Sequence, residues 1–162
     1  MASNKPKMLG KNTEIVYNIR VMIQYKIGPS SPDSDKIRQA VFLDEQGFSS
    51  EFFPEQDKHF TYITAYDDNK PIGVIRYKVN DEGFGIIGRL AVLKAYRKQK
   101  IARQLMLKAE HELRQLHVKE IHLHAQQPVM PFYEQLGYKG YSEIVMDEFM
   151  PHQWMKKELT DE

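Results

Sequence analysis

The sequence contains no cysteine, and this absence excludes several kinds of chemistry. Without a thiol the chain forms no disulfide and no thiolate metal site. It also forms no cysteine thioester with a substrate acyl group. The chemistry of this protein must therefore proceed without a cysteine thiol.

The sequence also lacks a large net charge and long apolar runs. The 23 Lys and Arg residues nearly balance the 22 Asp and Glu residues, so no global field would hold nucleic acid or an anionic membrane. No apolar run approaches the ~20 residues that span a bilayer, and residues 1–9 lack the apolar stretch of a signal peptide. We expect a cytoplasmic protein with no nucleic-acid or membrane partner.

The chain does have enough apolar sequence for one folded unit. A hydrophobic content of 41% over 162 residues is sufficient for a core. Residues 1–12 are polar and are predicted to be a flexible N-terminal tail. Residues 13–162 are predicted to be a single domain.

The hydrophobic periodicity predicts strands and helices in a mixed order. The predicted strands cover residues 17–25, 60–66, 72–79, 86–93 and 120–125, with a closing antiparallel pair at 141–149 and 154–159. The predicted helices cover residues 37–43, 101–117 and 128–137, the first of them capped by Asp33 or Ser34. The second helix makes a crossover between two strands, which implies that these strands are parallel neighbours. The fold class is therefore α/β (α+β), with a mixed, mostly antiparallel sheet flanked by helices.

A short basic turn joins the strand at 86–93 to the helix at 101–117. Arg97, Lys98 and Lys100 stand in this turn, beside the first N–H groups of the helix, which have no intrahelical acceptor. Cationic side chains at the positive end of a helix dipole favour an anion. The turn therefore predicts a diphosphate site, with a merely solvated basic turn as the alternative.

This turn, Arg97-Lys98-Gln99-Lys100-Ile101-Ala102, resembles the pyrophosphate loop of the GNAT superfamily of acetyl-CoA-dependent N-acyltransferases. The family pattern is Gln or Arg, two residues, Gly, one residue, then Gly or Ala. Arg97 and Ala102 match this pattern, whereas Lys100 stands in the usual glycine position. Glycine there permits a positive φ and a close approach of the backbone to phosphate, and lysine does not relieve that steric demand.

A second segment resembles the same family. Phe132-Tyr133, followed two residues later by Leu136-Gly137-Tyr138, is similar to its Phe-Tyr, two residues, Leu-Gly-Phe/Tyr motif. The Leu-His-Ala-Gln run at 123–126 resembles a small bacterial subgroup of the superfamily. The resemblance covers about residues 33–159.

The resemblance implies acetyl-CoA as the cosubstrate and a set of residues that hold it. The implied cofactor-binding residues are Leu90, Ala91, Val92, Arg97, Lys98, Gln99, Lys100, Ile101, Ala102, Gln127 and Tyr133. It also implies that the two parallel strands splay apart to admit the pantetheine arm, and that Tyr133 stands beside the departing sulfur as a hydrogen-bond donor or general acid. The alternatives are an ordinary core strand at 90–92, a solvent-facing Gln127 and a core Tyr133.

No single motif specifies the general base that an amine acceptor requires. His124 alternates with His122 on one face of its strand, and a histidine has an ordinary pKa near 6.5. Glu45, Glu55 or Asp57, or a chain of water molecules, could serve instead. The His-x-His pair could face a metal ion, but no spacing specifies a third ligand and no metal site is predicted.

Residues 47–57 combine phenylalanines with Glu51, Glu55 and Asp57 without any period. The resemblance implies that this segment borders the acceptor pocket, where its carboxylates would favour a cationic amine. A loop that plugs the edge of the sheet is the alternative. We expect Arg89 to form an internal ion pair with Glu55 or Asp57, with orientation of a substrate carboxylate as its other possible role.

These observations together predict an N-acetyltransferase that moves an acetyl group from acetyl-CoA to a primary amine of a small molecule, by direct attack in a ternary complex. The alternative is a CoA-binding or acyl-CoA-binding module of the same fold that has no turnover. A polyanion-binding module that uses the basic turn alone is a third hypothesis. The sequence leaves homodimerisation through the closing strands open.

Overall fold

The computed structural model describes residues 7–9, 14–16 and 22–160. Lys7–Leu9 (β1), within the predicted tail, pairs antiparallel with Glu14–Val16 (β2). Residues 17–21 of the first predicted strand lie outside the described residues, and the remainder of that strand is found in Ile23–Gly28 (β3).

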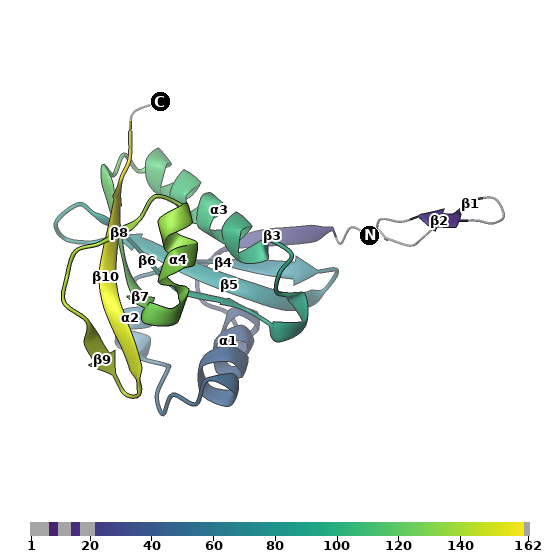
Figure 1. Cartoon of the computed structure of the whole chain (residues 1–162), viewed down its shortest axis with the longest axis horizontal. Helices are drawn as coiled ribbons and strands as arrows, with labels where there is room; N and C mark the ends of the chain where they lie inside the picture. The colour runs from purple at the N-terminus through teal and green to yellow at the C-terminus, as the bar shows by residue number, and fades with distance from the viewer. Residues whose placement is uncertain (1–6, 10–13, 17–21, 161–162) are drawn as a thin grey trace.

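The other described strands form one open sheet in the order β3-β4-β5-β6-β7-β10-β8, with β9 paired to β10 (Figure 1). Their bounds are Thr61–Asp67 (β4), Lys70–Val79 (β5), Gly85–Val92 (β6), Glu120–Gln126 (β7), Lys139–Gly140 (β8), Val145–Asp147 (β9) and Met150–Glu158 (β10). Among these described strands every pairing is antiparallel except that of β6 with β7. The mixed, mostly antiparallel fold predicted from the sequence is confirmed.

Helices cover both faces of this sheet (Figure 1). One face carries Ile101–Gln115 (α3) and Met130–Gln135 (α4). The other carries Pro32–Arg38 (α1), the π-helical Gln39–Glu45 (η1) that continues it, and Pro54–Asp57 (α2). Leu105, Ala109 and Leu113 of α3 are fully buried at the predicted helical spacing. No helix in the described part of the chain is long and apolar enough to cross a membrane.

The N-cap of helix α1 lies two or three residues before the predicted cap. Ser31 is the N-cap, and it exchanges hydrogen bonds with Ser34: the Ser34 backbone N–H donates to Ser31 Oγ at 3.1 Å, and the Ser31 N–H donates to Ser34 Oγ at 2.9 Å. Pro32 occupies the first turn, where its missing N–H costs no hydrogen bond. The prediction of Asp33 or Ser34 as the cap is therefore wrong, although Ser34 completes the reciprocal pair.

The closing strands pair antiparallel as predicted, but the turn between them lies elsewhere. Strand β9 ends at Asp147 and β10 already begins at Met150, so the predicted gap at 150–153 is part of a strand. Glu148 turns the chain with a φ of +56°. This shift brings His152 into the sheet, opposite Val145 on one side and Gln126 on the other.

The sheet opens between its two parallel strands. Pairing of β6 with β7 covers only Gly85–Ile87 opposite Ile121–Leu123, although both strands run further. On the opposite side of β6 a β-bulge interrupts the ladder, because Val74 faces Ala91 while Arg76 faces Gly88. Arg89, at a φ of +50°, lies in this bulge, and such an extra residue is left unpaired. The middle of β6 is therefore released from both neighbours.

Candidate functional site

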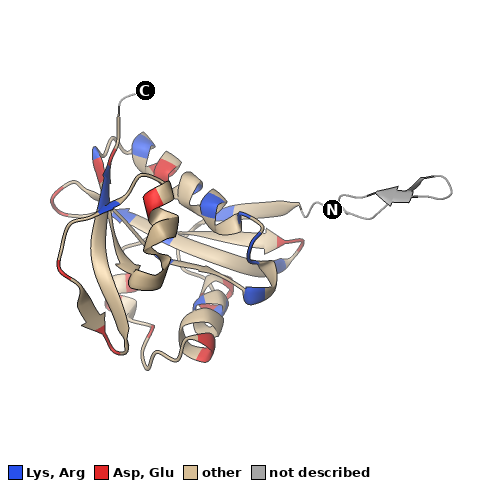
Figure 2. Ribbon diagram, in the orientation of Figure 1, with Lys and Arg blue, Asp and Glu red and all other residues tan. Residues whose placement is uncertain are grey.

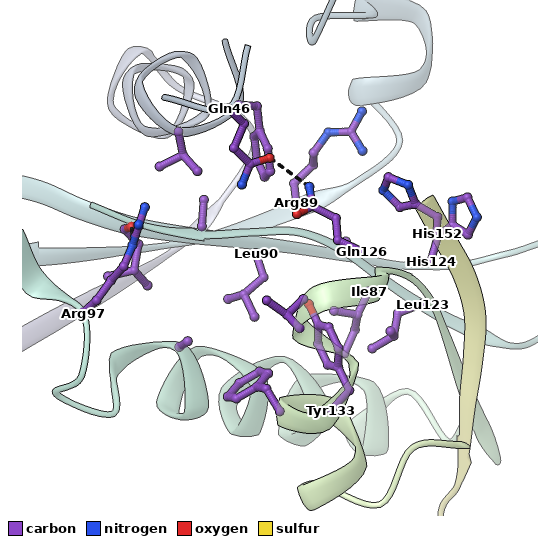
Figure 3. Close-up of a pocket in the computed structure, with 18 of the residues that line it drawn as sticks. Gln46, Ile87, Arg89, Leu90, Arg97, Leu123, His124, Gln126, Tyr133 and His152 are labelled. Atoms are coloured by element: carbon purple, nitrogen blue, oxygen red, sulfur yellow. Dashed lines mark hydrogen bonds between the residues drawn. The ribbon is translucent and has the colours of Figure 1, made fainter. Parts of the chain in front are cut away.

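A cavity of about 920 Å³ lies at this opening and is lined from both faces of the sheet (Figure 3). The lining residues on the α3 and α4 side include Ile101, Ala102, Phe132 and Tyr133, and those on the α1 side include Val41, Phe42, Gln46 and Glu51. The released residues of β6 and the end of β7 lie between the two groups. The cavity is thus a passage through the sheet, of a size usual for ligand sites.

The start of α3 forms one end of this cavity. Lys100 is the N-cap residue, in the left-handed conformation with φ +66°, and no side chain caps the helix there. The first N–H groups of α3 are therefore open to the turn. Lys98, Lys100 and Arg103 line the cavity around them, and Figure 2 shows basic residues along the turn into α3. Backbone donors and three cations in this arrangement would favour an anion.

The side chain of Arg97 clamps the turn to η1. Its Nε donates to Val92 O at 2.9 Å, and its Nη1 and Nη2 donate to the two Glu45 carboxylate oxygens at 2.7 and 2.6 Å. Hydrogen bonding from Arg97 lowers the pKa of Glu45. Glu45 does not line the cavity, and a carboxylate held in this way is a poor proton acceptor. Glu45 therefore positions the turn, which disfavours its predicted role as general base.

Tyr133 of α4 points its phenolic oxygen toward the sheet opening beside Leu90 (Figure 3). Its ring packs edge-on against Phe132 with 5.1 Å between the centroids. Among the described residues, its hydroxyl has no hydrogen-bond partner. Burial raises the pKa of Tyr133, so the hydroxyl keeps its proton at neutral pH and can donate it to a hydrogen bond.

Two histidines meet at the other side of the opening. His124 of β7 stacks between His152 at 4.8 Å and Trp154 at 4.7 Å, and both histidines line the cavity. Burial, and then the charge of His152, lowers the pKa of His124, while Asp147 opposes this shift. His152 was not predicted from the sequence. Its place on the same strand face as Trp154, which pairs opposite His124, follows only once β10 is known to begin at Met150.

His152 has a defined ring orientation. Its Nδ1 lies 3.0 Å from the backbone carbonyl of Met150, and a carbonyl only accepts, so Nδ1 carries the proton. The neutral ring therefore presents Nε2 as an acceptor. His122, by contrast, lies outside the cavity lining, with Tyr141 Oη and Glu120 Oε1 each at 2.7 Å from a ring nitrogen. Within the described residues, no cluster of three possible ligands could hold a metal ion.

The carboxylates of residues 47–57 are not free in a cleft. Glu55 is exposed and pairs with Lys58 at 2.8 Å, outside the cavity lining. Asp57 is buried, and although burial opposes the shift, a hydrogen bond from Arg76 and the charge of Arg38 lower its pKa. The expectation that three carboxylates attract a cationic amine is therefore wrong.

The internal ion pair expected for Arg89 exists, but its partner is Glu51. Arg89 Nε donates to Glu51 Oε2 at 2.8 Å. Neither Glu55 nor Asp57, the partners proposed from the sequence, forms this pair. Because Glu51 stands 38 residues before Arg89 in a segment without periodicity, no local pattern could select it.

A sequence model of one family, described as the acetyltransferase (GNAT) domain, matches residues 32–159. The chain belongs to the GNAT acetyltransferase family. It is 34% identical over 127 residues to a Bacillus subtilis (strain 168) protein named "Putative acetyltransferase". The matched region covers 76% of this chain and 86% of that protein. It is also 31% identical over 128 residues to the uncharacterized N-acetyltransferase YjcF of the same strain. That match covers 78% of this chain and 91% of YjcF. The crystal structure of Escherichia coli ElaA has the same fold, with a TM-score of 0.74, 24% identity and coverage of 84% and 99%.

This GNAT chain brings most of the predicted cofactor residues to one place. Those that line the cavity are Leu90, Ala91, Val92, Arg97, Lys98, Lys100, Ile101, Ala102 and Tyr133. Gln99 and Gln127 are exposed and do not line it. Gln126, one residue earlier, does line it and donates from Nε2 to Gln46 Oε1 at 2.9 Å (Figure 3). The subgroup suggested by the run at 123–126 stays a prediction.

Proposed function

We propose that this GNAT protein transfers an acetyl group from acetyl-CoA to the primary amine of a small molecule, by direct attack in a ternary complex. The observation that carries the proposal is the passage through the sheet. It joins an anion site at the start of α3 to a pair of histidines on the opposite face. A donor with a diphosphate and a long arm can therefore enter from one face while the acceptor enters from the other.

In this proposal the CoA diphosphate lies against the N–H groups that open α3, with Lys98, Lys100 and Arg103 around it. The pantetheine arm follows the released backbone of residues 90–92, which supplies hydrogen bonds as a strand edge does. The acetyl thioester then lies at the opening in the sheet. The Tyr133 hydroxyl, on the α4 side, points to the same opening (Figure 3).

The amine nitrogen attacks the thioester carbonyl carbon, so that a C–N bond forms and the C–S bond then breaks. Backbone N–H groups of the β6 bulge stabilise the charge that develops on the carbonyl oxygen. The Tyr133 hydroxyl donates a hydrogen bond to the departing thiolate. Full proton transfer from a phenol with a raised pKa is unfavourable, so hydrogen bonding suffices and water supplies the proton.

The proton that leaves the amine passes to the histidine pair. His152 is the better placed acceptor because Met150 fixes its ring with Nε2 free. His124, one of the candidate bases from the sequence, packs against it and can relay charge or replace it. Positioning of both substrates contributes the remainder of the rate enhancement.

A thiol-release assay with acetyl-CoA and a broad panel of primary amines tests this function. We expect turnover with at least one amine, and a loss in kcat of about 10- to 100-fold for Tyr133→Phe with little change in KM for acetyl-CoA. Tyr141→Phe is the matched control, because Tyr141 does not line the cavity. Calorimetry with acetyl-CoA separates binding from chemistry. Binding without thiol release across the panel would favour the non-catalytic module, and no binding at millimolar acetyl-CoA would refute both.

A further inference from the structure

On the α1 side of the sheet, the guanidinium of Arg89 is only partly used by the protein. Its Nε donates to Glu51 Oε2, and within the described part of the chain neither terminal nitrogen has a hydrogen-bond partner. Arg89 lines the cavity and its side chain is 32% exposed. The terminal N–H groups therefore remain available to a bound molecule.

Glu51 does not neutralise Arg89 by itself. The same Oε2 atom accepts a hydrogen bond from Nε of Arg38, which is fully buried, at 2.7 Å. Arg38 also donates to Asp57 Oδ2 at 3.1 Å, and Arg76 donates to Asp57 Oδ1 at 2.8 Å. Three guanidiniums thus share two buried carboxylates. Of the three, Arg89 is the one that lines the cavity.

Three other carboxylates lie near this cluster or line the cavity. Asp35 is 3.7 Å from Arg38 Nη1 and half exposed, so it contributes little to Arg89. Glu148 lines the cavity, but it accepts hydrogen bonds from the Ser49 backbone N–H and from Ser49 Oγ. Asp147, which also lines the cavity, acts on the charge of His124. Within the cluster itself, three guanidiniums face two carboxylates, which leaves one positive charge in excess, and Arg89 is the member that presents it to the cavity.

The surroundings of this charge are apolar. Val41, Phe42, Phe48 and Phe53 line the cavity on the same side of the sheet, and Phe48 packs on Phe149 with 4.8 Å between the rings. A charge-assisted hydrogen bond is stronger in such surroundings than in water. The wall therefore suits a ligand with an apolar body and one anionic group.

We propose that Arg89 binds a carboxylate of the acceptor, so that the acceptor is an amino acid or another amine that carries a carboxylate. This inference rests on the proposed acetyl transfer and adds the substrate class. Glu51 fixes the guanidinium through Nε and leaves both Nη groups free of partners among the described residues. These two groups point the same way, so together they can bind a planar carboxylate with two hydrogen bonds. The acceptor amine then faces the sheet opening and the histidine pair, which lie on the same side as Arg89 (Figure 3).

Pairs of acceptors that differ only in the carboxylate test this proposal. A panel of amino acids, each matched with its carboxamide, is assayed for kcat/KM with wild-type protein and with Arg89→Gln, and phosphoethanolamine serves as a phosphate-bearing amine. We expect the best wild-type acceptor to be an amino acid. We also expect Arg89→Gln to lower its kcat/KM about 10- to 100-fold, the loss typical of a hydrogen bond to a charged group. The matched carboxamide should change less than about 3-fold, so that Arg89→Gln abolishes the preference.

Two further measurements make the result unambiguous. Glu51 keeps its bond to Arg38 in Arg89→Gln, so the variant should fold, and Arg114→Gln, outside the cavity lining, controls for the loss of an arginine elsewhere. Calorimetric binding of N-acetyl amino acids and their carboxamides to the CoA-loaded protein needs no turnover, so it tests Arg89 even if acetyl transfer is absent. Equal use and equal binding of both members in every pair, or a preference for the phosphate-bearing amine, would overturn the proposal.

Discussion

His152 is the side chain whose hydrogen bonding most directly sets a chemical role. Its Nδ1 is held by Met150 O, and the ring lines the cavity next to His124. His152→Asn keeps a donor near the position of Nδ1 and removes Nε2. We expect this variant to lower kcat at neutral pH by roughly 100-fold, a usual contribution of a general base, with KM for acetyl-CoA nearly unchanged. Steady-state kinetics between pH 5 and 9 measure this effect.

The pH profile distinguishes His152 from its neighbour. Only a neutral imidazole accepts a proton, so kcat should rise with pH along an acidic limb set by whichever histidine is the base. If His124 were the base, its lowered pKa would place this limb below the ordinary histidine value of about 6.5. In that case His124→Gln would reduce kcat more than His152→Asn does, which would contradict our assignment.

Partners distant in the sequence decide what a side chain does here, and this limits prediction from local motifs. Arg97 was predicted as an anion ligand from its place in the turn, and the turn does line the cavity. Its guanidinium, however, is taken up by Glu45, 52 residues earlier. Arg89 likewise pairs with Glu51. The residue types were informative, but the pairing depended on tertiary contacts that have no period.

The junction between the basic turn and α3 shows how an element can begin without its usual residue. Lys100 adopts a φ of +66° where the family pattern has glycine, and this conformation costs a non-glycine residue about 1 kcal/mol. Lys100→Gly should therefore raise the free energy of unfolding by roughly 0.5 kcal/mol after the entropy of glycine is subtracted. Its acetyl-CoA affinity should fall less than about 5-fold, since one exposed charge is lost and the backbone donors remain.

A neighbouring residue provides the matched control for this prediction. Gln99 stands in the same turn but is not among the residues with positive φ. Gln99→Gly should therefore lower the free energy of unfolding, because glycine adds chain entropy there without relieving strain. Urea denaturation of the two variants measures the difference. Equal destabilisation by both substitutions would show that Lys100 is not strained.

The periodic elements were predictable, and the irregular ones were not. Helix α3 buries side chains at helical spacing, and strands β4 and β5 are nearly continuous buried runs, so their positions followed from the sequence. The π-helical η1 and the bulge at Arg89 follow no period, yet each places residues in the cavity. The start of β10 was also missed, and the strand accommodates Pro151 there, opposite Met146 of β9.

Across the molecule as a whole, the buried apolar residues that the structure describes form two clusters, one on each face of the sheet, and the passage connects them. Ile101 and Val92 belong to one cluster and Val41 and Ala91 to the other, and all four line the cavity. A ligand that fills the passage should therefore stabilise both layers together. Acetyl-CoA at 100 times its Kd should add about 2.7 kcal/mol to the free energy of unfolding. For a domain of this size, that corresponds to a rise in Tm of roughly 5 to 10 °C.

ATP provides the control that separates the whole passage from the basic turn. It carries phosphates and an adenine but no pantetheine arm, so it can occupy the start of α3 without reaching the opening between β6 and β7. Thermal denaturation should therefore show a much smaller rise in Tm with ATP than with acetyl-CoA at equal concentration. Equal shifts would mean that the charges of the turn account for all binding. The passage between the strands would then contribute nothing, and the polyanion-binding hypothesis would replace acetyl transfer.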